Sequence, residues 1–185
     1  MSPLQRAALF LVALFAAGPT SCKRSGHARV SSFLRPTLPA GFIERTGRGF
    51  RIAVPATWTA SGQGRAAWVY DDPQAVDDYR ANVSVVTEAY VGESYDYAKA
   101  AEDSARHDAR AAVGATREDV IDGDPTLVLE ARWSMGSPVV TFRSMQADLA
   151  SRGIGYVVTC SASPAAFERY RSTCEAIVHS FAVER

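Results

Sequence analysis

The sequence predicts an α+β domain in which an antiparallel β-sheet is flanked by helices. Several segments alternate apolar and polar side chains with a period of two, as strands do. Short turns join consecutive strands, which favours antiparallel pairing. Two other segments repeat apolar residues at steps of three and four, as amphipathic helices do. The predicted order is strands, a helix, four strands and a second helix.

The first part of this domain contains three predicted strands. Residues 50–54 alternate in polarity, and Pro55 ends them. Residues 66–70 form the second strand, which is closed by Asp71, Asp72 and Pro73. Residues 82–91 form the third, which Gly92 ends; its proposed inner face consists of Val83, Val85, Thr87, Ala89 and Val91.

The first helix is expected over residues 95–113, with Ser94 as its N-cap and Gly114 as its end. Tyr97 starts the inner face of this helix. The remainder of that face is small, which lets the helix approach a sheet closely; it consists of Ala98, Ala101, Ala105, Ala109 and Ala112.

Four strands follow. Residues 116–121 lead into a turn over residues 122–125, and residues 126–133 alternate clearly. After a turn over residues 134–138, the strand 139–149 changes its apolar parity near Met145, which predicts a β-bulge there.

The last strand and the last helix are expected to supply the core. Ile154, Tyr156, Val158 and Cys160 share one strand face. Ser163 is a candidate N-cap, and Pro164 suits a first helical turn. The helix then presents one apolar stripe, formed by Phe167, Tyr170, Cys174, Ile177, Val178 and Phe181.

Residues 1–21 have the pattern of a signal peptide, because Arg6 precedes an apolar run of about eleven residues. This run is shorter than the about 20 residues that a spanning helix needs. Thr20-Ser21-Cys22 resembles the lipobox of bacterial lipoproteins, although Pro19 stands where these proteins usually have an aliphatic residue. The resemblance implies that Cys22 is lipidated and becomes the new N-terminus. Plain secretion and a retained anchor are the alternatives.

Residues 22–41 are expected to form a flexible tether, since they are rich in Ser, Gly, Pro and Arg and no acidic residue precedes Glu44. Their positive charge favours an anionic lipid surface, and a plain solvated linker is the alternative. Lys23 stands where bacterial lipoproteins retained in the inner membrane usually carry Asp. The resemblance therefore implies an outer-membrane location facing the periplasm, if the host has two membranes. Residues 42–185 remain for the folded domain.

Several turns of the domain resemble those of the PsbP-like and DcrB-like bacterial lipoproteins. They are the Val54-Pro55-Ala56-Thr57-Trp58 opening, the Asp72-Pro73 turn, the Asp122-Gly123-Asp124-Pro125 turn and the Ser180-Phe181 ending. The resemblance covers roughly residues 42–185. It implies an α-β-α sandwich around an antiparallel sheet and an accessory, partner-binding role without enzymatic activity, catalytic residues or a cofactor.

The three cysteines allow a parity argument. If Cys22 carries lipid, Cys160 and Cys174 remain as a pair in an oxidising compartment, which predicts a disulfide. A helix starting near Ser163 puts Cys174 roughly 15 Å along its axis, whereas Cys160 lies only roughly 10 Å before the cap. Two buried thiols are therefore the alternative.

Other chemistry is weakly indicated. His27, His107 and His179 are isolated, and no zinc, triad or dinucleotide motif is present. Lys plus Arg equals Asp plus Glu, 20 each, so nothing points to nucleic acid. An acidic loop contains Asp71, Asp72, Asp77 and Asp78, which we expect to hold no metal, calcium being the alternative.

The aromatic residues of the first half are expected to be mostly core, and an exposed minority would mark a partner surface; they are Trp58, Trp68, Tyr70, Tyr79, Tyr90 and Tyr95. Together these observations favour a membrane-tethered envelope lipoprotein whose domain binds a protein partner. A carrier of a small apolar ligand, held between sheet and helix, is the second hypothesis. An enzyme of unrecognised type is the third.

Overall fold

The computed structural model describes residues 38–61 and 68–184. The predicted signal peptide, the lipidation site Cys22 and most of the tether lie outside the described residues. In the described part of the chain, neither helix is long and apolar enough to cross a membrane.

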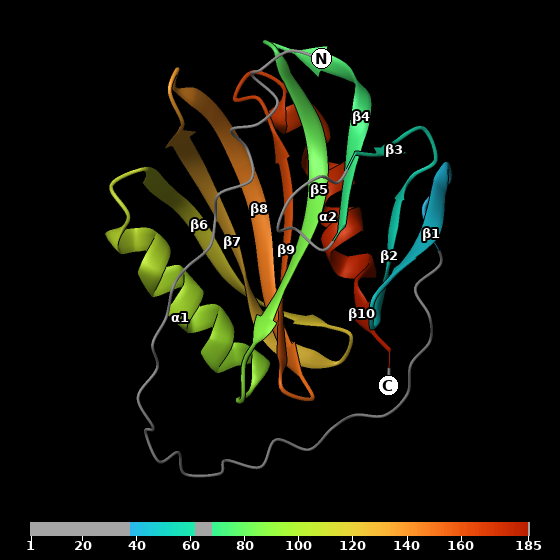
Figure 1. Cartoon of the computed structure of the whole chain (residues 1–185), viewed down its shortest axis with the longest axis vertical. Helices are drawn as coiled ribbons and strands as arrows, with labels where there is room; N and C mark the ends of the chain where they lie inside the picture. Colours follow the sequence, from blue (N-terminus) through green and yellow to red (C-terminus); the bar gives the residue numbers. More distant parts are fainter. Residues whose placement is uncertain (1–37, 62–67, 185) are drawn as a thin grey trace.

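A seven-stranded antiparallel sheet forms the centre of the domain, in the order β3-β4-β5-β9-β8-β7-β6 (Figure 1). Its strands are β3 (Thr59–Ala60), β4 (Trp68–Val76), β5 (Tyr79–Ala89), β6 (Ala111–Ile121), β7 (Asp124–Met135), β8 (Val140–Ser151) and β9 (Ile154–Ala162). A smaller antiparallel sheet has the order β1-β2-β10 and consists of β1 (Phe42–Gly47), β2 (Phe50–Pro55) and β10 (Ala182–Val183).

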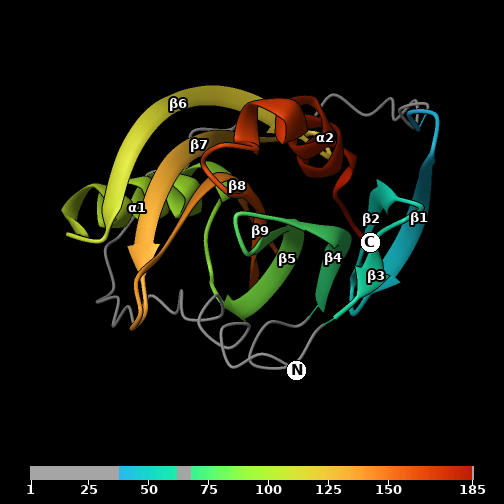
Figure 2. The ribbon, with the colours of Figure 1, turned by 90° about the horizontal axis from the view of Figure 1, so that it is seen from above.

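The two helices lie on opposite faces of the large sheet, as the view from above shows (Figure 2). Helix α1 (Ser94–His107) packs on β6, β7 and β8. Helix α2 (Phe167–Ser180) packs against β9, β8 and β5 and also contacts β2, so it lies between the two sheets. The predicted α+β class and the α-β-α sandwich are therefore confirmed.

Most of the core lies on the α2 face of the sheet. The predicted helix stripe is confirmed: Phe167, Cys174, Ile177 and Val178 are buried, as is Phe181 directly after the helix. These residues meet inward-facing strand residues of both sheets, which include Phe50, Val83, Val85, Met145 and Val158. A smaller cluster on the α1 face joins Ala105 to residues of β7 and β8, which include Leu129, Trp133 and Phe142.

Helix α1 ends six residues earlier than the predicted 113, at His107. The Asp108 carboxylate accepts a hydrogen bond from the Arg110 amide at 2.8 Å and so reverses the chain. From Ala111 onward the backbone pairs with β7, beginning opposite Trp133. A full ladder of sheet hydrogen bonds thus outweighs the helix propensity of Ala109 and Ala112, which lie outside the helix.

The bulge predicted near Met145 is absent, because β8 keeps a continuous register with both β7 and β9. The apolar parity changes because β8 is buried on both faces, by α2 on one side and by α1 on the other. Register shifts occur instead in β4, between Asp71 and Ala75, and in β6, between Val113 and Thr116. Strand β4 therefore continues past the Asp71-Asp72-Pro73 sequence that was expected to end it.

Other boundaries also differ. Strand β5 ends at Ala89, so Val91 lies outside it and is 94% exposed. Ser94 and Ser163 do not cap their helices directly. The Ser94 hydroxyl bonds the backbone of Ala150 on β8, and the Ser163 hydroxyl accepts the Ala166 amide in a turn that precedes α2.

Candidate functional site

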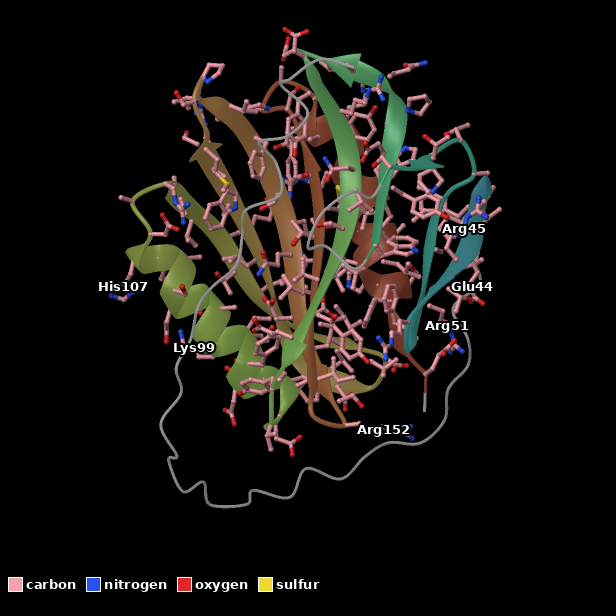
Figure 3. All side chains as sticks on the ribbon, in the orientation of Figure 1. Glu44, Arg45, Arg51, Lys99, His107 and Arg152 are labelled. Atoms are coloured by element: carbon pink, nitrogen blue, oxygen red, sulfur yellow. A yellow bond between two sulfur atoms is a disulfide. The ribbon has the colours of Figure 1, made fainter. Side chains whose placement is uncertain are left out.

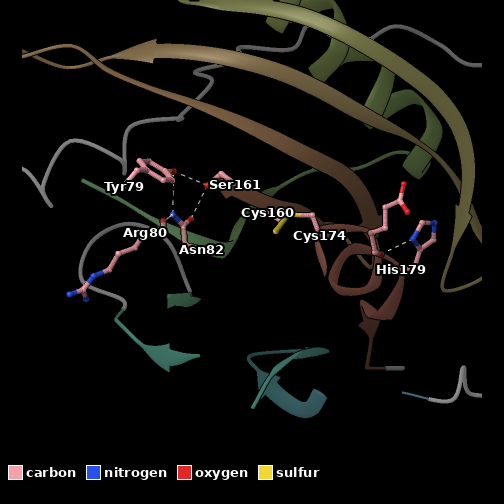
Figure 4. The surroundings of a disulfide bond; sticks show 8 residues. Tyr79, Arg80, Asn82, Cys160, Ser161, Cys174 and His179 are labelled. Carbon is pink, nitrogen blue, oxygen red and sulfur yellow. Dashed lines mark hydrogen bonds between the residues drawn. A yellow bond between two sulfur atoms is a disulfide. The ribbon is translucent and has the colours of Figure 1, made fainter. Parts of the chain in front are cut away.

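Cys160 on β9 and Cys174 on α2 form a disulfide that fixes α2 to the sheet (Figure 4). Their Cα atoms are 5.3 Å apart, and both side chains are fully buried. A helix starting near Ser163 would have put Cys174 farther from the start of the helix than Cys160 lies before it. The helix begins at Phe167 instead, so Cys174 lies only about 10 Å along its axis and meets Cys160. The oxidised state in the cell stays a prediction.

The α1 face of the large sheet is only partly covered. Helix α1 lies over β6, β7 and β8, and no described helix or strand crosses the front of β9 and β5 (Figure 1). We call this uncovered region the open face and define it by three residues of β9 and three of β5: Gly155, Val157, Thr159, Ser84, Val86 and Glu88. Gln146 and Asp148 of β8 border it on the side of α1 and are buried.

The strand register arranges these residues in rows across the sheet. Ser84, Thr159 and Gln146 form one row, and Thr159 donates to the Gln146 side chain at 3.4 Å. Val86, Val157 and Asp148 form the next row. The side chains on β5 and β9 are half-buried except at Gly155, so the floor of the open face combines two accessible valines with hydroxyl groups. Such a mixed floor is suited to contact with another polypeptide.

Tyr97 of α1 closes the lower end of the open face. Its hydroxyl donates a 2.6 Å hydrogen bond to Glu88, and its ring packs on Tyr90 with 4.4 Å between centroids. The ring lies directly over Gly155, where any Cβ would come within 2.7 Å of the Tyr97 ring. Glycine at position 155 is therefore required for Tyr97 to reach Glu88.

Asp148 is the most unusual charged residue of this region, because its side chain is only 1% exposed. Burial raises the pKa of Asp148 to about 7; the hydrogen bond from Gln146 opposes this rise, and the charge of Glu88 adds to it. Burial and the hydrogen bond to Glu88 likewise raise the pKa of Tyr97, and the charge of Asp148 adds to this effect. Burial therefore favours the protonated form of Asp148 at the border of the open face, and Glu88 is the partly accessible carboxyl group of the face itself.

The polar side chains of this region are hydrogen-bonded to one another. The Gln146 side chain donates to both carboxyl oxygens of Asp148, at 3.1 and 3.0 Å. The Tyr97 hydroxyl donates a hydrogen bond to the Glu88 carboxylate. The hydroxyl of Thr159, the nearest alcohol by register, bonds an amide rather than a base. What the open face offers a ligand is the half-buried Glu88 carboxylate beside two half-buried valines, Val86 and Val157.

The other predicted candidates separate in space. Asp72 accepts hydrogen bonds from the Tyr170 hydroxyl and the Gln74 amide, whereas Asp77 and Asp78 form the β4–β5 turn with positive φ. Within residues 38–61 and 68–184, no group of three potential ligands is placed to hold a metal ion. His179 bonds Asp119 at 2.9 Å, and His107 bonds the Asp103 carbonyl of its own helix.

The apolar-ligand hypothesis obtains no support from the shape of the domain. A depression lined by Ala100, Asp103, Ser104, His107 and Asp108 lies along the outer side of α1 and is open to solvent. It is not the apolar space between sheet and helix that a carrier would need.

Four of the six predicted aromatic residues lie in the core or pack against it, and the other two are more accessible. Trp58 and Tyr79 are buried, and Tyr79 also bonds Ser161 and Asn82, to the left of the disulfide in Figure 4. Trp68 and Tyr70 pack against the main core. Tyr90 and Tyr95 are the more accessible members, and Tyr90 borders the open face through its contact with Tyr97.

The sequence patterns did not predict Glu88, Asp148 and Gln146 as a group. The available signal was a pair of polar residues, Gln146 and Asp148, inside the most apolar part of a strand. The second signal was Gly155 within a β-branched strand, which indicates a close approach by another group. Only the strand order, in which β9 lies between β5 and β8, brings Glu88 near Asp148.

Comparisons with known proteins identify the fold. No family model matches the chain, and no curated protein matches it. The solution structure of cyanobacterial PsbP (CyanoP) from Synechocystis sp. PCC 6803 is similar, with a TM-score of 0.54 and 18% identity, over 89% of this chain and 98% of that chain. LpqN, described as involved in cell envelope biogenesis of Mycobacterium tuberculosis, gives a TM-score of 0.56 and 13% identity, over 74% of this chain and 83% of that chain. The chain therefore has a PsbP-like fold.

Proposed function

We propose that this protein is an exported lipoprotein, tethered to the cell envelope through Cys22, whose domain binds a protein partner without catalysing a reaction. The open face carries this proposal, because it is a sheet surface that no described element covers and on which no catalytic pair is assembled. The signal-peptide pattern, the Cys160–Cys174 pair and a fold shared with an envelope protein support the location.

The lipid anchor is tested by Cys22→Ser. We expect the wild-type protein in the membrane fraction, with an N-terminal peptide that carries acyl chains on Cys22. The variant should appear in the soluble fraction of the same compartment. A wild-type protein that is soluble and begins at another residue would contradict the anchor and leave the binding function untouched.

Partner binding is tested by affinity capture from intact envelopes with a matched pair of variants. Ser84→Arg places a long cation on the open face, whereas Ser172→Arg makes the same change on the exposed side of α2. We expect Ser84→Arg to lose a specific envelope protein that the wild type and Ser172→Arg both retain. If all three proteins capture the same set, the open face is not the partner site.

A further inference from the structure

The outer edge of β6 is a long strand edge with which no described strand pairs. Strand β6 ends the large sheet and pairs only with β7, over the eleven residues Ala111–Ile121 (Figure 1). The opposite end of the same sheet is the two-residue strand β3. An unpaired edge presents backbone donors and acceptors to which another extended chain can bond.

The hairpin that joins β6 to β7 determines which backbone groups point outward. Val120 lies opposite Pro125, which has no N–H group, and the Val120 N–H group bonds the Asp119 side chain at 2.8 Å. This pair is therefore one that exchanges no ladder hydrogen bonds, and every second residue of β6 shares its orientation. The N–H and C=O groups of Thr116 and Glu118 thus point away from β7 and remain for another strand to bond.

The side chains of β6 connect the strand to both helices. On one face Arg117 pairs with Asp119, and Asp119 also bonds His179 of α2 at 2.9 Å. On the other face the Thr116 hydroxyl accepts a hydrogen bond from Arg106 of α1 at 3.4 Å. These contacts hold the strand in place and leave its outer backbone uncovered by any described element.

The edge carries a carboxylate next to an apolar side chain. Glu118 is exposed and accepts a hydrogen bond from the Tyr95 hydroxyl at 3.1 Å, but no described cation forms an ion pair with it. Lys99 of α1, labelled in Figure 3, pairs instead with two acidic residues of its own helix. Val120 follows two positions later on the same strand face and is 61% exposed.

We propose that β6 accepts an extended segment of another envelope protein as an eighth strand of the large sheet, paired along residues 116–120. Backbone hydrogen bonds to Thr116 and Glu118 provide the affinity, and the side chains provide the specificity. The segment has a basic residue opposite Glu118 and, two positions away, an apolar residue opposite Val120. The inference depends on the proposed function only for the kind of partner, because Val120 and Ser84 of the open face are separated by four strand spacings, about 19 Å.

A second copy of the domain fits this edge less well. Symmetric antiparallel pairing of two β6 strands places one residue opposite its own copy. A register centred on residue 117, 118 or 119 therefore puts like charges directly opposite each other, which destabilises a strand pair. A register centred on Thr116 must pair the irregular stretch between Val113 and Thr116, where β6 shifts its register with β7. Charges and a bulge thus protect the edge against indiscriminate pairing and leave it to a complementary segment.

Site-specific photocrosslinking in intact cells tests the inference, with a photoreactive amino acid at position 120 of the whole chain. We expect an adduct whose crosslinked peptide, identified by mass spectrometry, carries a basic and an apolar residue two positions apart. Glu118→Ala removes only the carboxylate and should lower the yield of adduct several-fold. Glu118→Pro also removes an outward N–H group, which an edge strand tolerates, and should abolish the adduct.

Urea unfolding of both variants checks that the domain still folds, and a second measurement needs no variant. A synthetic peptide with the sequence of the crosslinked segment should slow amide hydrogen exchange at Thr116 and Glu118 of the wild-type protein by about tenfold. Exchange at the Ser84 amide should not change. Unchanged exchange at Thr116 and Glu118 would contradict strand addition.

The inference is overturned by the absence of an adduct from position 120, by equal yields from Glu118→Ala and Glu118→Pro, or by an adduct between two copies of the chain. An adduct from position 120 and none from position 84 would support it and contradict the proposed contact at the open face. The reverse result would support the open face and overturn the β6 inference, so the two failures are distinguishable.

Discussion

Replacing Asp148 by Asn should make the stability of the domain less dependent on pH. The side chain is buried, and its pKa rises from an ordinary value of 3.8 to about 7. At about 1.4 kcal/mol per pH unit, this difference corresponds to about 4 kcal/mol. Asn keeps the volume of the side chain and still accepts a hydrogen bond from Gln146, but it cannot ionise.

The direction of the effect follows from proton binding. Between pH 4 and pH 7 the unfolded chain has lost the Asp148 proton, whereas the folded protein retains it. This residue therefore lowers the free energy of unfolding as pH rises through that window. Above pH 7 the ionised Asp148 lowers the free energy of unfolding by a constant amount. Below pH 4 this destabilisation is absent, because both states bind the proton.

Urea unfolding at intervals from pH 4 to pH 8 measures this effect as the difference between wild type and Asp148→Asn. We expect the variant to gain about 4 kcal/mol relative to wild type across the window. Asp78→Asn, at an exposed turn position that tolerates Asn, is the matched control and should run parallel to wild type. Parallel profiles for Asp148→Asn and wild type would refute the electrostatic account of the open face.

Three further predictions concern the core and the site. Cys174→Ala should leave a folded domain that is less stable by about 3 kcal/mol in urea unfolding, and thiol counting on unfolded, unreduced wild-type protein should find neither Cys160 nor Cys174 free; two free thiols would remove the bridge. Phe181→Ala should cost about 3–5 kcal/mol without touching sulfur, because Phe181 stacks on Phe50 at 5.4 Å and contacts Tyr156 at 5.5 Å; a loss below about 1 kcal/mol would contradict its place in the core. Gly155→Ala should destabilise the domain by about 1–3 kcal/mol by displacing the Tyr97 ring, and the loss should shrink when Tyr97 is replaced by Ser; equal losses in both backgrounds would show that the ring is not the obstacle.

Local patterns in the sequence predict the α2 side of the domain well. The stripe from Phe167 to Phe181 and the face of Tyr156, Val158 and Cys160 are each regular, and both are buried in the main core. Under these conditions the period of the apolar residues gives the element and its buried face directly.

The α1 side was harder to predict because tertiary contacts override local preference there. Ala109 and Ala112 favour a helix, yet the open edge of β7 captures the chain from Ala111 onward. The change of parity near Met145 comes from burial of β8 on both faces, which depends on where α1 lies. The open face depends on strand order for the same reason, since Glu88 and Asp148 are 60 residues apart in the sequence and meet only across β9.

The central claim is that the open face contacts another protein in the envelope, and site-specific photocrosslinking in intact cells tests it most directly. A photoreactive amino acid is placed at position 84 on the open face or at position 172 on α2. The account predicts a covalent adduct with a second envelope protein from position 84 and none from position 172. An adduct from position 172 alone, or none from position 84, would contradict it.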